Sequence, residues 1–404
     1  MPYYRSVGEV PRKRHTLFRD AGGNRLAEEL MGAQGFSGAS ALLYHRHSPS
    51  AITSVTPIKM PTSPLRPNDP LLPWHLVARG DDTGIDGGSD PVTGRRVLLG
   101  NEAVVISVVR AAAASELYRN AAGDELVYIQ DGTATLESVF GTLPVATGDY
   151  VVVPASTTHR WVVDEPVSML VLQATGHIGI PDRYVTDRGQ LKEGAPFSER
   201  DLRGPAAPLL VEDGDVGVLV RTRTGWSRHC HVSHPFDVVG WDGCLYPYAF
   251  SIRDFEPIVG RLHQPPPVHQ TFAGPGFVVC SFVPRPFDFD PDAVKVPYHH
   301  ANVDSDEVLF YAEGDFMSRR GAGIGPGSIT LHPAGFVHGP QPGSVEASLG
   351  ATRTDETAVM IDTFSPLLLS DDARRVADLD YPWTWAGLRL TPPAPEGPGG
   401  AEPH

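Results

Sequence analysis

Three side chains in the C-terminal half of the chain have the types and the spacing of a metal site. They are His300, Glu307 and His338, and the last of them closes the stretch GSITLHPAGFVH at residues 327–338. Two imidazoles and one carboxylate are the donor set of non-haem Fe(II) oxygenases, which leaves coordination positions open for a substrate and O2. Because no cysteine belongs to the set, it favours iron over zinc. The chemistry that we expect is therefore oxidation by O2 at an Fe(II) centre.

A similar pattern occurs in the N-terminal half of the chain. Glu307 follows Glu125 by 182 positions. His338 follows His159 by 179 positions, and two spacings that agree this closely indicate a duplicated unit. The first copy has YRNAAG (118–123) where the second has histidines, so it keeps only one carboxylate and one imidazole. We therefore expect the first copy to be structural and free of metal.

Both copies resemble the cupin pattern, which belongs to a double-sheet jelly-roll barrel. The stretch that ends at His338 matches this pattern throughout, whereas Asn302 stands where the preceding stretch usually has its second histidine. Short β-branched runs separated by turn residues agree with such a barrel. We expect strands at 103–109, 126–129, 134–139, 150–153, 169–173, 277–283, 308–312, 328–331 and 358–362. The predicted fold class is all-β, a bicupin of two jelly-roll barrels with an N-terminal extension.

The length and local composition suggest how the chain is divided. A chain of 404 residues has room for two or three domains. We place the N-terminal extension and the metal-free barrel in residues 1–205, with an irregular segment at 1–75, and the catalytic barrel in residues 206–390. Polar residues 181–225 are the predicted connection, and residues 391–404 are a predicted disordered tail. A short helix is expected over residues 370–379, capped by Ser370 or Asp371.

Charge and hydropathy restrict the partners and the compartment. The formal net charge of −15 argues against a nucleic-acid partner, because such binding needs a basic face. No apolar run approaches the ~20 residues of a membrane span, and the N-terminus lacks the apolar run of a signal peptide. The three cysteines give no disulfide framework. We therefore expect a cytoplasmic protein with no nucleic-acid or membrane partner.

Longer motifs resemble the homogentisate 1,2-dioxygenase family and cover roughly residues 1–385. They begin with PRKRHT (11–16), EELMG (28–32), GFSG (35–38) and LLYH (42–45). They continue with PFDVVGWDG (235–243), YPY (246–248), PYHHAN (297–302) and HGP (338–340). The motifs are long and non-repetitive, so chance is a poor explanation for them.

This resemblance implies a reaction and a role for each matching residue. The family cleaves the ring of homogentisate to maleylacetoacetate with Fe(II) and O2, in tyrosine and phenylalanine catabolism. The resemblance implies that His300, Glu307 and His338 hold the iron. It makes His332 a second active-site histidine, with His332 and His338 both in contact with the substrate. His263 matches the family's acid–base histidine, a role that suits an imidazole with a pKa near 6.5. The family forms trimers and hexamers, which implies a homo-oligomer.

Two departures from the family leave the substrate open. The loop between Asn302 and Glu307 is one residue longer than in the family. Phe316 stands where the family has a substrate-binding tyrosine, and it cannot donate that hydrogen bond. Another hydroxylated aromatic acid is therefore an alternative substrate. A non-redox cupin with Zn or Mn, and a bicupin without catalytic activity, are the alternatives in other functional classes.

Other histidines have alternative interpretations. His269 lies close to His263 in the sequence and is the alternative acid–base. His229 to His231, with His234 nearby, fit no standard zinc spacing, so we predict packing or surface roles for them. We expect His45 and His47 to pack or to form hydrogen bonds in the N-terminal region, although His45 also lies in one of the family-like motifs.

Overall fold

The structure, a computed structural model, describes residues 2–61, 63–78, 89–213, 216–319 and 321–388, so the predicted tail at 391–404 lies outside the described residues. Among these residues the two α-helices, α1 (Ser344–Ser348) and α2 (Asp371–Arg375), are short, and strands make up most of the regular structure. The predicted all-β class is confirmed. Short 3-10 turns are η1 (Gln34–Phe36), η3 (Asp182–Tyr184), η4 (Glu199–Asp201), η5 (Ile252–Asp254), η6 (Pro266–His269), η7 (Met317–Arg319) and η8 (Tyr381–Ala386).

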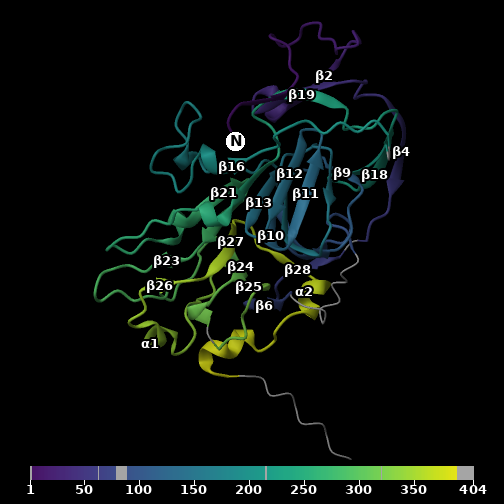
Figure 1. The fold of residues 1–404 in the computed structure, drawn as a ribbon. Coiled ribbons are helices and arrows are strands. Elements are labelled where there is room, and N and C mark those ends of the chain that lie inside the picture. Colours follow the sequence, from purple (N-terminus) through teal and green to yellow (C-terminus); the bar gives the residue numbers. More distant parts are fainter. Residues whose placement is uncertain (1, 62, 79–88, 214–215, 320, 389–404) are drawn as a thin grey trace, which may run out of the picture.

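The first barrel consists of two large sheets, whose strands β9 to β13 are blue in Figure 1. The nine-stranded sheet has the order β16 (Leu202–Arg203), β20 (Tyr248–Ser251), β13 (Asp149–Val153), β10 (Glu125–Asp131), β15 (Val167–Ala174), β8 (Val104–Ala111), β7 (Arg96–Gly100), β28 (Leu368–Ser370) and β5 (Leu65–Arg66). The seven-stranded sheet has the order β12 (Gly141–Ala146), β11 (Thr133–Ser138), β14 (His159–Val162), β9 (Leu117–Asn120), β17 (Gly217–Arg221), β18 (Trp226–His231) and β4 (Ile52–Ile58). Apolar side chains from both sheets form one buried core that includes Val127, Leu136 and Trp161.

The second barrel is smaller and lies beside the first. Its six-stranded sheet has the order β21 (Gln270–Gly274), β22 (Phe277–Phe282), β27 (Thr357–Thr363), β24 (Asp306–Glu313), β25 (Ser328–His332) and β6 (Trp74–Val77). β23 (Arg285–Pro286) pairs with β26 (Arg353–Thr354), and an isolated bridge joins His300 to His338. The runs predicted as strands fall on β8, β10, β11, β13, β15, β22, β24, β25 and β27, so the bicupin prediction is confirmed.

The N-terminal segment is not irregular, and that prediction was wrong. β1 (Arg5–Gly8), β2 (Ala27–Gly32) and β3 (Ser40–His45) join β19 (Val238–Gly243) in a four-stranded sheet of order β1-β19-β3-β2. This sheet covers the top of the first barrel in Figure 1. Its central partner, β19, comes from a distant part of the chain. In β4 the side chains from Ile52 to Pro57 are all exposed, so this part of the strand has no buried face.

The predicted connection at residues 181–225 belongs to the first barrel and its surroundings, because it contributes β16 and β17 to the two large sheets. β18 and β20 also follow residue 206 but belong to the first barrel, and β19 belongs to the N-terminal sheet. Conversely, β6 precedes residue 206 but pairs with β25 of the second barrel. The two barrels also share one apolar cluster, which includes Leu126 and Val308. A boundary at residues 205 and 206 therefore does not follow the sheets.

The helix predicted over residues 370–379 is present but shorter. The hydroxyl of Ser370 accepts a hydrogen bond from the Ala373 backbone at 2.9 Å, so Ser370 is the N-cap. The helix ends at Arg375 because the chain then pairs with β6, through a bridge between Ala377 and Leu76.

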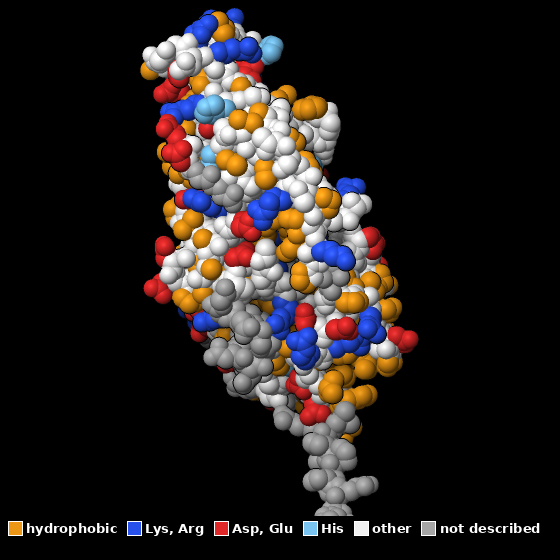
Figure 2. Space-filling view, turned by 90° about the vertical axis from the view of Figure 1, so that its right-hand side faces the viewer, with side chains coloured by type: hydrophobic (Ala, Val, Ile, Leu, Met, Phe, Trp, Pro, Cys, Tyr) orange, Lys and Arg blue, Asp and Glu red, His pale blue; other side chains and the backbone are white. Residues whose placement is uncertain are grey.

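Acidic and basic side chains are interspersed on the face shown in Figure 2. Within the described part of the chain, no helix is both long enough and apolar enough to cross a membrane.

Candidate metal centre

His300, Glu307 and His338 come together at one end of the second barrel. Glu307 is the second residue of β24, and His338 follows β25, the strand paired with β24. The backbone N–H of His300 donates to the His338 carbonyl at 2.8 Å, and the His338 N–H donates back to the His300 carbonyl at 2.9 Å. One ligand atom from each of the three side chains lies within 4.8 Å of the others. The structure therefore brings together the three residues that the sequence pattern singled out.

Backbone hydrogen bonds determine which ring nitrogen each histidine presents. Nδ1 of His300 lies 3.1 Å from the Tyr298 carbonyl, and Nδ1 of His338 lies 3.1 Å from the Phe336 carbonyl. Each Nδ1 donates to its carbonyl, so Nε2 is the atom of each ring that faces Glu307 and that would bind a metal once deprotonated. His300 Nε2 lies 3.6 Å from one carboxylate oxygen, and His338 Nε2 lies 3.2 Å from the other. Metal-binding histidines are commonly oriented in this way, so the donor set fits a divalent metal.

The charges of these side chains also favour a metal site. Burial raises the pKa of Glu307, but hydrogen bonds with His300, His332 and His338 outweigh burial and hold this pKa well below its usual range. The hydrogen bond with Glu307 in turn raises the pKa of His300. A charged carboxylate therefore faces imidazoles that would give up their protons to a metal, because metal ligands bind in their deprotonated form.

His332 supports the ligand carboxylate from behind. Its Nδ1 lies 2.9 Å from Glu307 Oε1, and its Nε2 lies 2.8 Å from the Tyr381 hydroxyl. The side chain is fully buried, and burial lowers its pKa to about 3. His332 is therefore a neutral imidazole with both nitrogens engaged, which suits a residue that orients Glu307. Its predicted contact with the substrate stays a prediction.

A cavity of about 400 Å³ opens beside His300 and Glu307. Its volume is within the range of small-ligand sites. Phe282, Leu309 and Met360 give it apolar walls, and other wall positions carry the cations Arg285, Lys295 and Arg319. The cavity could therefore hold an aromatic ring against apolar surface while a cation faces an acid group.

His263 and His269 both line this cavity, but their surroundings differ. His263 is half exposed, and its Nδ1 lies 2.9 Å from Asp288 Oδ2. His269 is buried, and its Nδ1 has no hydrogen-bond partner among the described residues. Burial, with a contribution from nearby Arg285, lowers the pKa of His269 to about 3. His263 thus has a carboxylate that would stabilise an added proton, whereas His269 stays neutral.

Phe316 does not line the cavity. Its buried ring packs edge-on against Tyr311, with 4.8 Å between ring centroids. Tyr311 does line the cavity, and its hydroxyl accepts a hydrogen bond from Arg319 Nε at 3.1 Å. The predicted contact of Phe316 with the substrate stays a prediction, and a different phenol is available in the wall.

Three further residues of this region were missed in the sequence: Tyr381, Arg285 and Asp362. Asp362 lies opposite Glu307 in the pairing of β24 with β27, and its Oδ1 is buried without a hydrogen-bond partner. Burial, together with the charge of Glu307, raises the pKa of Asp362 to about 7. The one available signal was an acidic residue within the apolar run of a predicted strand. For Tyr381 and Arg285 the sequence carries no comparable signal.

Comparisons with known proteins give a consistent result. The family model described as Homogentisate 1,2-dioxygenase N-terminal matches residues 92–252. A putative dioxygenase of Saccharolobus solfataricus is 39% identical over 389 residues, which covers 95% of this chain and 99% of that protein. A homogentisate 1,2-dioxygenase of Rhodopseudomonas palustris is 26% identical over 362 residues, which covers 83% of this chain and 77% of that protein. Among solved structures, a cupin 2 conserved barrel domain protein from Leptotrichia buccalis is 10% identical with a TM-score of 0.32, covering 71% of this chain and 97% of that one.

Proposed function

This chain belongs to the homogentisate 1,2-dioxygenase family, and we propose that it is an Fe(II)-dependent enzyme that opens the ring of homogentisate with O2. The observation that carries the proposal is the convergence of His300, Glu307 and His338 beside a cavity large enough for an aromatic acid. Two imidazoles and one carboxylate suit Fe(II), which would pass electrons from the substrate to O2 and would leave coordination positions open for both. The reaction would belong to tyrosine and phenylalanine catabolism in the cytoplasm.

The side chains of the cavity would bind the substrate and move one proton. Nδ1 of His263 faces Asp288, so its Nε2 is the atom that would take the proton of a substrate hydroxyl. Asp288 would stabilise the resulting imidazolium, as a carboxylate beside a general base does. The apolar walls would exclude water from the ring, and Arg285 or Lys295 would attract the acid group of the substrate.

The alternative substrate is another hydroxylated aromatic acid. Phe316 favours this alternative, because the hydroxyl that the family tyrosine would give the substrate is missing at this position. A site that lacks one polar partner can change its preference between substrates by orders of magnitude. We keep homogentisate as the first candidate because Tyr311 places a phenol hydroxyl in the wall of the cavity, which Phe316 does not reach.

The test is O2 uptake by the whole chain after loading with Fe(II) in the absence of O2. Homogentisate, gentisate and 3-hydroxyanthranilate are offered in turn, and the same chain loaded with Zn(II) is the control. We expect fast uptake with homogentisate, appearance of the absorbance of the ring-opened product, and none of either with Zn(II). Uptake with another acid alone would change the substrate. Bound iron without uptake on any acid would contradict the proposed reaction.

The acid–base residue can be identified in the same assay. We expect His263→Asn to lower kcat by about 10²-fold or more, because general acid–base catalysis contributes roughly that much. It should also remove the acidic limb of the pH–rate profile. His269→Asn is the matched variant and should keep that limb. The reverse outcome would assign the proton transfer to His269.

We also propose a homo-oligomer. The exposed edge strand β4 and the N-terminal sheet offer surfaces for such an assembly. The molar mass in solution, measured by light scattering, tests this directly, since a monomer would weigh 43.5 kDa.

A further inference from the structure

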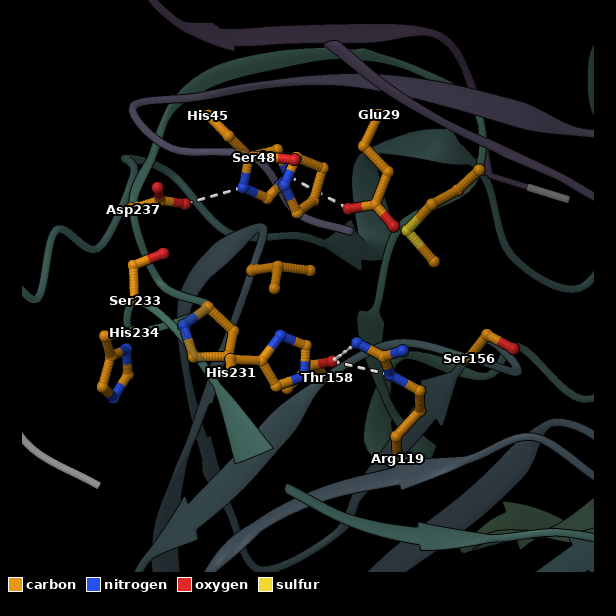
Figure 3. A pocket seen from close by; sticks show the side chains of 14 residues that line it. Glu29, His45, Ser48, Arg119, Ser156, Thr158, His231, Ser233, His234 and Asp237 are labelled. Carbon is orange, nitrogen blue, oxygen red and sulfur yellow. Dashed lines mark hydrogen bonds and ion pairs between the residues drawn. The ribbon is translucent and has the colours of Figure 1, made fainter. Parts of the chain in front are cut away.

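A second, smaller pocket lies between the N-terminal sheet and the first barrel, away from the metal centre. We call it the extension pocket, and Figure 3 shows it. It has a volume of about 50 Å³ and shares no lining residue with the large cavity. The exposed side chains of Ser48 and Ser156 lie among its lining, so small molecules can enter from solvent. Neither the metal site nor the proposed reaction uses it.

The side of the extension pocket formed by the N-terminal sheet carries a net negative charge. His45 is buried between two carboxylates: its Nδ1 lies 2.7 Å from Asp237 and its Nε2 lies 3.0 Å from Glu29. Burial opposes protonation of His45, but these hydrogen bonds raise its pKa to about 9. One positive charge therefore faces two negative charges. The second oxygen of Glu29 is directed toward the interior of the pocket in Figure 3.

The opposite side, formed by the first barrel, carries a positive charge. Nε and Nη2 of Arg119 donate to the Thr158 hydroxyl at 2.8 and 2.6 Å. Among the described residues, no carboxylate lies within ion-pair distance of Arg119. Burial lowers its pKa, which shows how poorly solvated this cation is.

His231 adds an unused polar atom on the same side. Its side chain lines the pocket, only 8% of its surface is exposed, and its buried Nε2 has no hydrogen-bond partner in the part of the chain that the structure describes. Burial and the charge of Arg119 lower its pKa, which favours a neutral imidazole, and Nε2 would donate in the tautomer that carries the hydrogen there. A buried polar atom without a partner destabilises the fold, and a ligand that pairs with it would remove this cost.

The two sides together determine the class of ligand. A simple anion would pair with Arg119 but would be repelled by the negative charge of Glu29. A simple cation would pair with Glu29 but would be repelled by the positive charge of Arg119. We propose that the extension pocket binds a small zwitterion of the amino-acid class. Its carboxylate would accept hydrogen bonds from Arg119 and His231, and its ammonium group would donate to Glu29. Charge-assisted bonds of this kind are the strong ones.

The volume limits the ligand to the smallest member of the class. About 10–15 Å³ of such space holds one water molecule, so 50 Å³ holds roughly three to five atoms of that size. Glycine, with about five non-hydrogen atoms, fills this space. A bound molecule would connect the N-terminal sheet to the first barrel, because Glu29 lies in β2 and Arg119 in β9.

The experiment uses the whole chain and measures Tm against concentration at constant ionic strength. The probes are glycine, sodium acetate, ethylammonium chloride and sodium chloride. We expect a saturable rise of about 1–3 °C with glycine alone, since a ligand that binds only the folded state stabilises it by mass action. Saturation-transfer NMR on the glycine signal should show the same saturation.

Two variants make the test specific. Arg119→Met should abolish the response to glycine, whereas Arg228→Met, which removes a surface arginine of neighbouring β18, should keep it. Glu29→Gln should make acetate and glycine equally effective, and it tests the proposal even if Arg119→Met does not fold. An equal response to acetate in the unmodified chain would overturn the zwitterion, and the absence of any saturable response would mean that the pocket holds only water.

Discussion

Glu125 and Glu307 occupy corresponding places in the two barrels, but their surroundings differ completely. Glu307 faces the imidazoles of His300, His332 and His338. Both oxygens of Glu125 instead accept hydrogen bonds from Arg95, at 2.8 and 2.9 Å. Tyr118, Asn120 and Gln173 add three more donors. In the first barrel a guanidinium occupies the place that a metal would take in the second.

The aspartates that precede the two carboxylates make equivalent hydrogen bonds to the backbone. Asp124 precedes Glu125, and its side chain accepts bonds from the backbone of Ala155 at 2.7 Å and of Ile178 at 2.8 Å. Asp306 precedes Glu307 and accepts equivalent bonds from Ala334 and Leu367, both at 2.8 Å. The comparison teaches that one scaffold holds a carboxylate in a fixed place, and that the neighbouring side chains decide whether it binds a metal or an arginine.

The largest expected effect comes from exchanging the corresponding histidines. His338→Gln removes one of the three proposed metal ligands, and we expect iron affinity to fall by at least 10²-fold and O2 uptake to fall to background. His159→Gln, the matched change in the first barrel, should leave both unchanged, because His159 Nε2 has no partner in the described structure. Iron analysis of the two purified variants checks this, and equal iron contents would contradict the assignment.

The next largest effect concerns Arg95, which pairs with Glu125 in the first barrel. Arg95→Met leaves the carboxylate of Glu125 buried and unpaired, since Arg95 and Glu125 are 6% and 1% exposed. We expect a loss of about 3–5 kcal/mol in the free energy of unfolding. Arg160→Met breaks a surface ion pair with Glu137 and should cost less than about 1 kcal/mol. Denaturant unfolding measures both, and similar losses would mean that Arg95 does not hold Glu125.

The next prediction concerns His45 in the N-terminal sheet, whose charge should make the free energy of unfolding depend on pH. The folded pKa of His45, about 9, lies above its ordinary value of 6.5. The stabilisation by this charge is therefore complete below pH 6.5 and is lost as pH rises through 9, a change of about 3 kcal/mol in the free energy of unfolding. Urea unfolding of the chain and of His45→Gln between pH 6 and 9.5 tests this. The variant should lose this part of the pH dependence, and parallel curves would refute the charged state of His45.

The smallest effect comes from Tyr381, which reaches the candidate ligand Glu307 only through His332. Tyr381→Phe removes the hydroxyl that bonds to His332 Nε2, so we expect about tenfold weaker iron binding with the fold intact. Tyr248→Phe removes a buried hydroxyl that has no partner in the described structure and should leave iron binding unchanged. Competition with a ferrous chelator measures both affinities, and equal values would show that His332 does not depend on Tyr381.

The sequence predicted those features that are encoded locally. The barrel strands were predictable because their apolar residues alternate within short runs, as in β10 and β24. The candidate ligands were predictable because their spacing repeats between the two halves. The strands before residue 75 were missed because their partners, such as β19 for β1 and β3, lie far along the chain.

The surroundings of the ligands were beyond prediction for the same reason. Arg95 lies 30 positions from Glu125, and Tyr381 lies 49 positions from His332. Neither distance matches a strand or helix period, so only the folded chain shows these contacts. The extension pocket likewise joins Glu29 to Arg119, which no motif connects.

The most direct test of the account is to locate iron in crystals of the chain reconstituted with Fe(II). Anomalous scattering at the iron edge should give one peak per chain, between His300, Glu307 and His338. The first barrel should give none, because Arg95 fills the place beside Glu125. A peak beside Glu125, or no peak at either carboxylate, would contradict the account.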